Sequence, residues 1–122
     1  MKNTPNAQIA EDLRNKIRNS ENIEQLTGLT LERYKQWMDF TKEFYIPKNY
    51  NRQIDTEHQY PLSRYDLSAE ENVKFCNNWK HLRYMTHEEN KKKLNNMPTP
   101  LDRFKQAVIV IMYQNFISLK NE

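Results

Sequence analysis

The chain contains a single glycine, Gly28, among 122 residues. Tight hairpins and phosphate-binding loops depend on glycine, because both use backbone conformations that other residues rarely adopt. The sequence therefore argues against a sheet-rich fold and against a glycine-rich nucleotide loop, and it favours a mainly helical chain. The length suits one compact domain, and we expect residues 1–122 to form a single domain.

Charge and composition leave several function classes open. The net charge is +3, with 37% apolar and 29% charged residues. A charge this small neither requires nor opposes nucleic-acid binding, so any binding face must be formed locally. The single cysteine, Cys76, excludes an internal disulfide and a cysteine-rich zinc site, and we expect it to pack as a small apolar residue.

Hydropathy predicts a protein without a membrane segment. No apolar run approaches the roughly 18 residues of a spanning helix. The N-terminal residues also lack the apolar stretch of a secretion signal. We therefore expect a soluble, intracellular, cytoplasmic protein, located in the host cell if its source is a phage or another virus.

Helical periodicity appears at both ends of the chain. Residues 1–45 form a helical N-terminal part, with helices expected over 4–18 and, capped by Thr30, over 31–44. Residues 99–120 form a C-terminal helix with proline at its first position. Its apolar stripe is expected to be buried, and comprises Leu101, Phe104, Val108 and Ile111.

The middle of the chain alternates between extended and helical patterns. Residues 52–60 and 79–84 are expected to be extended, with a helix over about 69–77 between them. Thr86-His87-Glu88-Glu89 has the pattern of a capping box and predicts a further helix, ending near residue 94. The expected fold class is therefore α+β, mainly helical.

A histidine next to a carboxylate is the strongest chemical signal. His58 can act as a general base because imidazole titrates near neutral pH, and Glu57 is a hard oxygen ligand suited to magnesium or manganese. Strand neighbours point to opposite faces, so these two side chains need a bend near Pro61 to flank one phosphate, whereas Asp55 shares the face of Glu57. Asn90 is a second ligand candidate.

Three strings of the sequence resemble the HNH endonucleases of phage and homing type. Residues 57–67, Glu-His-x-x-Pro-Leu-Ser-x-Tyr-Asp-Leu, resemble the family's Asp-His-x-x-Pro-Leu-Ser-x-Phe-Asp-Leu. Residues 76–85 resemble its Cys-x-x-Trp-x-Asn-Leu-Arg block, and residues 89–93 resemble its Glu-Asn-x-x-Lys ending. The resemblance covers about residues 52–95.

This resemblance implies a ββα-metal core over residues 52–95, flanked by the N-terminal and C-terminal helices. It implies that His58 is the general base and that Glu57 and Asn90 hold a divalent cation, Mg²⁺ or Mn²⁺, with Asp55 as a further candidate ligand. The family has an asparagine that orients the base where this chain has His81. By resemblance, His81 orients His58 or contacts phosphate, and catalysis depends on this position.

The resemblance implies phosphodiester hydrolysis of DNA by an HNH endonuclease or nickase, with RNA open as a substrate. Six basic residues are expected to contact the nucleic-acid backbone: Arg52, Arg64, Arg83, Lys91, Lys92 and Lys93. The alternative is an HNH-fold protein that has lost catalysis and binds nucleic acid or a protein partner, as a viral accessory or inhibitor. A third reading is a helical interaction protein. A homodimer through the C-terminal helix stays open.

Overall fold

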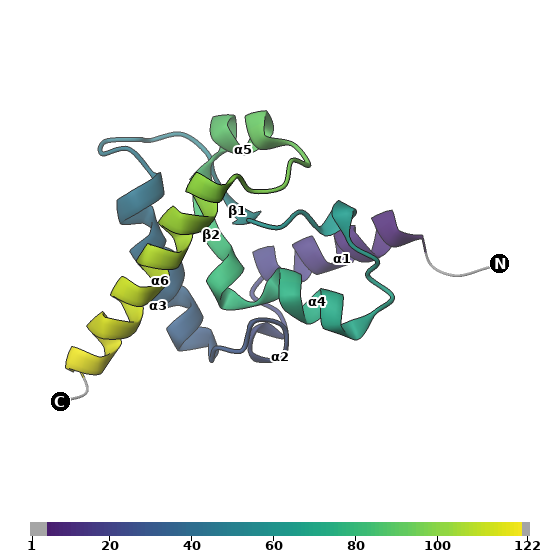
Figure 1. Cartoon of the computed structure of the whole chain (residues 1–122), viewed down its shortest axis with the longest axis horizontal. Coiled ribbons are helices and arrows are strands. Elements are labelled where there is room, and N and C mark those ends of the chain that lie inside the picture. The colour runs from purple at the N-terminus through teal and green to yellow at the C-terminus, as the bar shows by residue number, and fades with distance from the viewer. Residues whose placement is uncertain (1–4, 121–122) are drawn as a thin grey trace.

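A computed structural model describes residues 5–120 of the chain as an α+β fold that is mainly helical (Figure 1). Six α-helices lie in this range: α1 (Asn6–Arg18), α2 (Ile23–Thr27), α3 (Leu31–Tyr45), α4 (Glu70–Asn77), α5 (His87–Lys93) and α6 (Pro100–Lys120). Two short 3₁₀ turns, η1 (Leu62–Arg64) and η2 (Trp79–His81), lie on either side of α4 in the sequence. The expected helical and extended segments are thus found close to their predicted bounds.

Local capping explains where several helices begin and end. The Thr30 side chain accepts a hydrogen bond from the Arg33 amide and begins α3. Thr86 accepts from the Glu89 amide in the same way and begins α5. Gly28 ends α2 with φ at 88°, a conformation that glycine adopts without steric cost. The one glycine is therefore placed where the backbone needs it.

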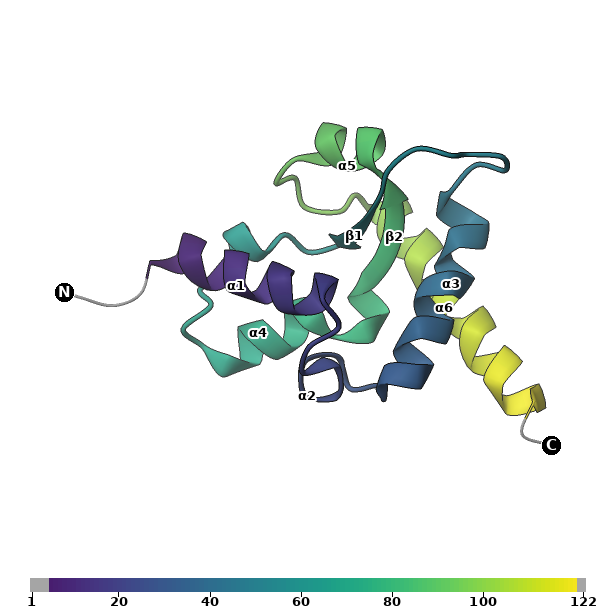
Figure 2. The ribbon, with the colours of Figure 1, turned by 180° about the vertical axis from the view of Figure 1, so that it is seen from behind.

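The only sheet within residues 5–120 is an antiparallel pair of strands, β1 (Ile54–His58) and β2 (Leu82–Thr86). Glu57 pairs with Arg83 and His58 pairs with Leu82. The helix α5 follows β2 directly and contacts both strands. In Figure 2, β1 lies between α1 on one side and α5 on the other.

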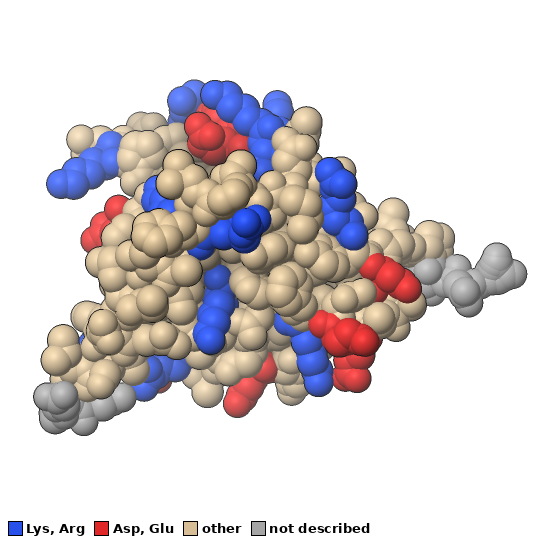
Figure 3. Space-filling model, in the orientation of Figure 1, with Lys and Arg blue, Asp and Glu red and all other residues tan. Residues whose placement is uncertain are grey.

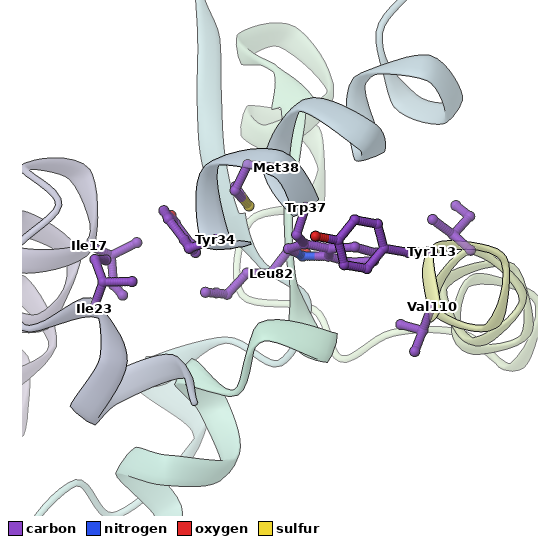
Figure 4. Packing of buried hydrophobic residues seen from close by; sticks show 9 residues of the cluster. Ile17, Ile23, Tyr34, Trp37, Met38, Leu82, Val110 and Tyr113 are labelled. Atoms are coloured by element: carbon purple, nitrogen blue, oxygen red, sulfur yellow. The ribbon is translucent and has the colours of Figure 1, made fainter. Parts of the chain in front are cut away.

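Large aromatic side chains fill the main core, which joins α3, α6 and β2 (Figure 4). The Trp37 ring packs edge-on against Tyr113, with 5.3 Å between ring centroids. Its indole Nε1 donates to the Leu82 carbonyl at 3.0 Å, so the buried indole nitrogen is satisfied. A second cluster comprises Ala10, Leu13, Leu62, Leu67 and Cys76. Cys76 is therefore a buried apolar residue, as expected.

The predicted buried face of α6 is wrong. The residues of α6 that are buried are Gln106, Ile109, Val110 and Tyr113. Leu101 and Phe104 are instead 77% and 67% exposed, and Val108 and Ile111 are exposed as well. The helix is apolar on two sides, so periodicity alone could not decide which side packs on α3. No helix within residues 5–120 has the length and apolarity needed to cross a membrane.

Candidate functional site

A hollow of about 530 Å³ lies beside β1, between α1 and α5. A second hollow, of about 220 Å³, lies next to it. The two hollows share four of their lining residues: Arg14 from α1, Thr56 and His58 from β1, and Asn90 from α5. The sequence candidates His58 and Asn90, 32 residues apart, are therefore brought to one place.

His58 is held in a fixed orientation by Asn77, the last residue of α4. Its Nε2 lies 2.8 Å from the Asn77 Oδ1, and the Asn77 amide nitrogen donates to the Val73 carbonyl at 2.9 Å. Because that nitrogen is committed to the Val73 carbonyl, the amide oxygen faces the ring and accepts from the His58 Nε2–H. The basic lone pair of His58 is then on Nδ1.

The environment of His58 favours the neutral imidazole. Burial lowers the pKa of His58 to about 4, against an ordinary value of 6.5. The bond to Asn77 acts in the opposite direction, and the positive charges of Arg14 and Lys93 lower the pKa further. His58 is thus unprotonated at neutral pH and can accept a proton, as a general base must.

This shift predicts that the folded protein loses stability as the pH falls from about 6.5 to about 4. In that range the unfolded chain binds a proton at His58 and the folded chain does not, so the free energy of unfolding rises with pH. The stabilising contribution of His58 is complete above the pKa of the unfolded chain, about 6.5. The contribution is about 3 kcal/mol. Urea unfolding at several pH values measures it. In His58→Gln the free energy of unfolding should depend less steeply on pH between about 4 and 6.5. An unchanged pH dependence would contradict the lowered pKa of His58.

Asp55 and Asn90 form an oxygen-rich pair on the wall of the larger hollow. The Asn90 amide donates to Asp55 Oδ2 at 2.9 Å, and His87 Nδ1 lies 2.8 Å from the same oxygen. Burial raises the pKa of Asp55, but the hydrogen bonds from Asn90, His87 and Gln53 outweigh it and hold that pKa below its usual value. Asp55 is therefore an anion at neutral pH.

Glu57 is buried and already paired with two cations, which argues against it as a metal ligand. Its Oε1 lies 2.8 Å from Arg83 Nε, and its Oε2 lies 2.8 Å from Lys93 Nζ. Lys93 also donates to the His58 carbonyl at 3.4 Å. Because both carboxylate oxygens are neutralised, a divalent cation would have to displace Lys93 to reach Glu57.

The predicted contact of Arg83 with phosphate is wrong, because the Arg83 side chain is buried within the fold. The side chain is 1% exposed and forms a two-pronged pair with Asp102 of α6, at 2.8 and 3.1 Å. The other expected phosphate contacts differ in exposure. Lys91 and Lys92 are exposed on α5, where blue side chains gather at the top of Figure 3. Lys93 is partly buried against Glu57.

The remaining predicted contacts, Arg52 and Arg64, are exposed but lie outside the two hollows. Arg52 pairs with Glu88 at 3.4 Å, with most of its side chain in solvent. Arg64 donates to the Asn95 carbonyl at 2.8 Å. Neither side chain lines the hollows that His58 lines.

His81 does not orient His58. Its Nδ1 bonds the Phe75 carbonyl at 2.6 Å, and its ring packs against Tyr60 and Phe75. Burial lowers the pKa of His81, against the effect of the Phe75 bond. The orienting role expected for His81 falls to Asn77 instead, which is fully buried and four residues earlier.

Sequence reasoning missed three residues of this site: Arg14, Asn77 and His87. Asn77 stands directly after Cys76 in the second string that resembles the HNH family, but its contact with His58 across 19 residues gave no signal in the sequence. Arg14 and His87 gave no signal, because an exposed charge on a helix and a histidine in a first turn are common surface features.

Comparison with protein-family models, with curated proteins and with solved structures finds no match to this chain. Within residues 5–120, no group of three or more histidine, cysteine, aspartate or glutamate side chains is arranged to hold a metal ion. A cation at the larger hollow would therefore need oxygens from outside the chain besides those of Asp55 and Asn90.

Proposed function

We propose that this protein is a metal-dependent nuclease of the HNH type that hydrolyses phosphodiester bonds, with His58 as the general base. The observation that carries the proposal is the neutral, oriented imidazole of His58 in the hollow that Asn90 also lines. The order β1, β2, α5 and the contacts of α5 with both strands agree with a ββα-metal core.

The residues at the hollow fit a divalent cation through Asp55 and Asn90. A carboxylate and an amide oxygen are ligands that Mg²⁺ and Mn²⁺ prefer, and Mg²⁺ usually keeps several waters or substrate phosphate oxygens besides one or two carboxylates. The low pKa of Asp55 keeps the carboxylate charged. When bound, the cation would stabilise the negative charge that develops on the phosphate and on the leaving oxygen.

The chain's own residues would supply the proton transfer and the substrate contacts. His58 would take a proton from the attacking water through Nδ1, while Asn77 keeps the ring from turning. Arg14 lines both hollows and is exposed, so it can bind a phosphate oxygen. Lys91 and Lys92 would add contacts to the nucleic-acid backbone, which is DNA by resemblance.

Nicking of supercoiled plasmid DNA tests this proposal. We expect nicking with Mg²⁺ or Mn²⁺, none in excess EDTA, and at least a tenfold lower rate in Asp55→Asn, because the neutral amide is a weaker ligand. Asp39→Asn is the matched control, since Asp39 is exposed on α3. Equal rates in Asp55→Asn and the wild type, or nicking that EDTA does not affect, would contradict the proposal.

A nucleic-acid-binding protein without catalysis is the second candidate. The pairing of Glu57 with Arg83 and Lys93 favours it, because a carboxylate with two cations on it is poorly available to a metal. This reading predicts that the folded protein retains DNA without nicking it in Mg²⁺, Mn²⁺ or Ni²⁺. A gel-shift assay and the nicking assay on the same preparation distinguish the two candidates.

A further inference from the structure

The outer face of α6 is a long, largely exposed apolar surface, at one edge of which the Phe116 ring stacks on Phe40 of α3. Between Lys105 and Lys120 the helix carries no charged residue. Seven of its apolar side chains are exposed: Leu101, Phe104, Val108, Ile111, Met112, Phe116 and Leu119. At 3.6 residues per turn they cover an arc of about 140° on the side away from the buried residues. Over α6 the surface in Figure 3 is mostly uncharged.

Six of these residues are arranged symmetrically about Val110. Leu101 and Leu119 lie nine positions to either side of it, Phe104 and Phe116 six positions, and Val108 and Met112 two positions. On a helical wheel the members of each pair also lie at equal angles about one line along the helix. A two-fold axis brings the same side of each helix together, so in an antiparallel pair Leu101 meets Leu119 on the central line and Val108 lies beside Met112, whereas Phe104 and Phe116 lie on opposite edges of the interface.

We infer that α6 is the interface of a homodimer in which two copies of this chain pair their outer α6 faces in antiparallel orientation. The two polar positions within the arc, Lys105 and Asn115, lie five residues to either side of Val110. They lie on opposite edges of the arc. In this register Lys105 of one copy lies beside Phe116 of the other copy, and Asn115 lies beside Phe104, so no like charges are opposed.

The area agrees with a stable dimer. The exposed fractions of the seven side chains add up to about four fully exposed side chains, or roughly 600–800 Å² of apolar surface. Specific interfaces bury about 800 Å² on each partner. The largest apolar patch on a typical soluble monomer covers about 300–600 Å². Antiparallel helices also place each N-terminus beside the partner's C-terminus, where their dipoles attract.

Sedimentation equilibrium over micromolar to submillimolar concentrations tests the inference on the full chain. We expect a dimer for the wild type. Val108→Glu and Met112→Lys should each raise the dissociation constant roughly a hundredfold, because each dimer then buries two unpaired charges. Gln114→Glu, at an exposed position outside the apolar arc, should leave the constant unchanged.

Mixing the two variants tests the register. In the antiparallel pairing, Val108→Glu on one chain faces Met112→Lys on the other, so an equimolar mixture should recover a heterodimer that neither variant forms alone. Far-UV circular dichroism checks that both variants stay folded. A monomeric wild type, a dimer that Val108→Glu leaves intact, or a mixture that stays monomeric would each overturn the inference.

Discussion

His58→Ala should lower the rate of metal-dependent plasmid nicking by about 10²–10⁴-fold, the usual contribution of a general base. The substitution removes the group with a free lone pair in the hollow and leaves the oxygens of Asp55 and Asn90 in place. Metal binding should therefore persist while hydrolysis is lost. The initial rate of nicking at saturating Mg²⁺ or Mn²⁺ measures the loss.

His81→Ala is the matched control for this prediction. His81 bonds the Phe75 carbonyl and lines neither of the two hollows beside β1. We expect its replacement to change the nicking rate less than tenfold. If His81→Ala lost as much activity as His58→Ala, the orienting role would belong to His81, and its assignment to Asn77 would be wrong.

Arg83→Ala should destabilise the fold by about 3–5 kcal/mol, the usual cost of removing one partner from a buried ion pair. The guanidinium bonds Glu57 of β1 and Asp102 of α6, and it also donates to Tyr45 of α3 at 3.2 Å. Burial lowers the pKa of Arg83, but Asp102 and Glu57 outweigh it and raise that pKa, so the arginine stays charged. Without it, Asp102 loses its two-pronged partner.

Urea denaturation of Arg83→Ala and Arg52→Ala measures this difference. Arg52 also forms an ion pair, with Glu88, but 70% of its side chain is exposed, so its loss should cost about 1 kcal/mol or less. The comparison separates a buried network from a surface pair. A similar loss of stability in the two variants would show that the Arg83 network contributes little to the fold.

The sequence predicted the helices well because their signals are local. Thr30 and Thr86 cap the helices that follow them, and the apolar periodicity of α1 and α3 matches the faces that pack. The face of α6 could not be chosen in this way. Both sides of that helix are apolar, and only contact with Trp37 and Leu82 decides which side is buried.

The candidate site was predicted in part. His58 and Asn90 lie together as expected, at one hollow that Asp55 also lines. Strand alternation alone would place Asp55 and His58 on opposite faces, so their common hollow could not be predicted from it. The phosphate contact predicted for Arg83 was wrong, and the pairing of Glu57 with Arg83 and Lys93 argues against its predicted role as a metal ligand. A charged residue in a short strand gives no local sign of being buried with a partner. The role of Asn77 depends on a contact across 19 residues, which spacing along the chain does not reveal.

The central claim is that His58 and a divalent cation share one hollow, and proton NMR of the histidine rings during Mn²⁺ titration tests it without knowledge of the substrate. Paramagnetic Mn²⁺ held by Asp55 and Asn90 should broaden the His58 ring signals well before those of His81, and Asp55→Asn should require more Mn²⁺ for the same broadening. His58 signals that stay sharp at millimolar Mn²⁺, or that broaden only together with those of His81, would contradict the claim.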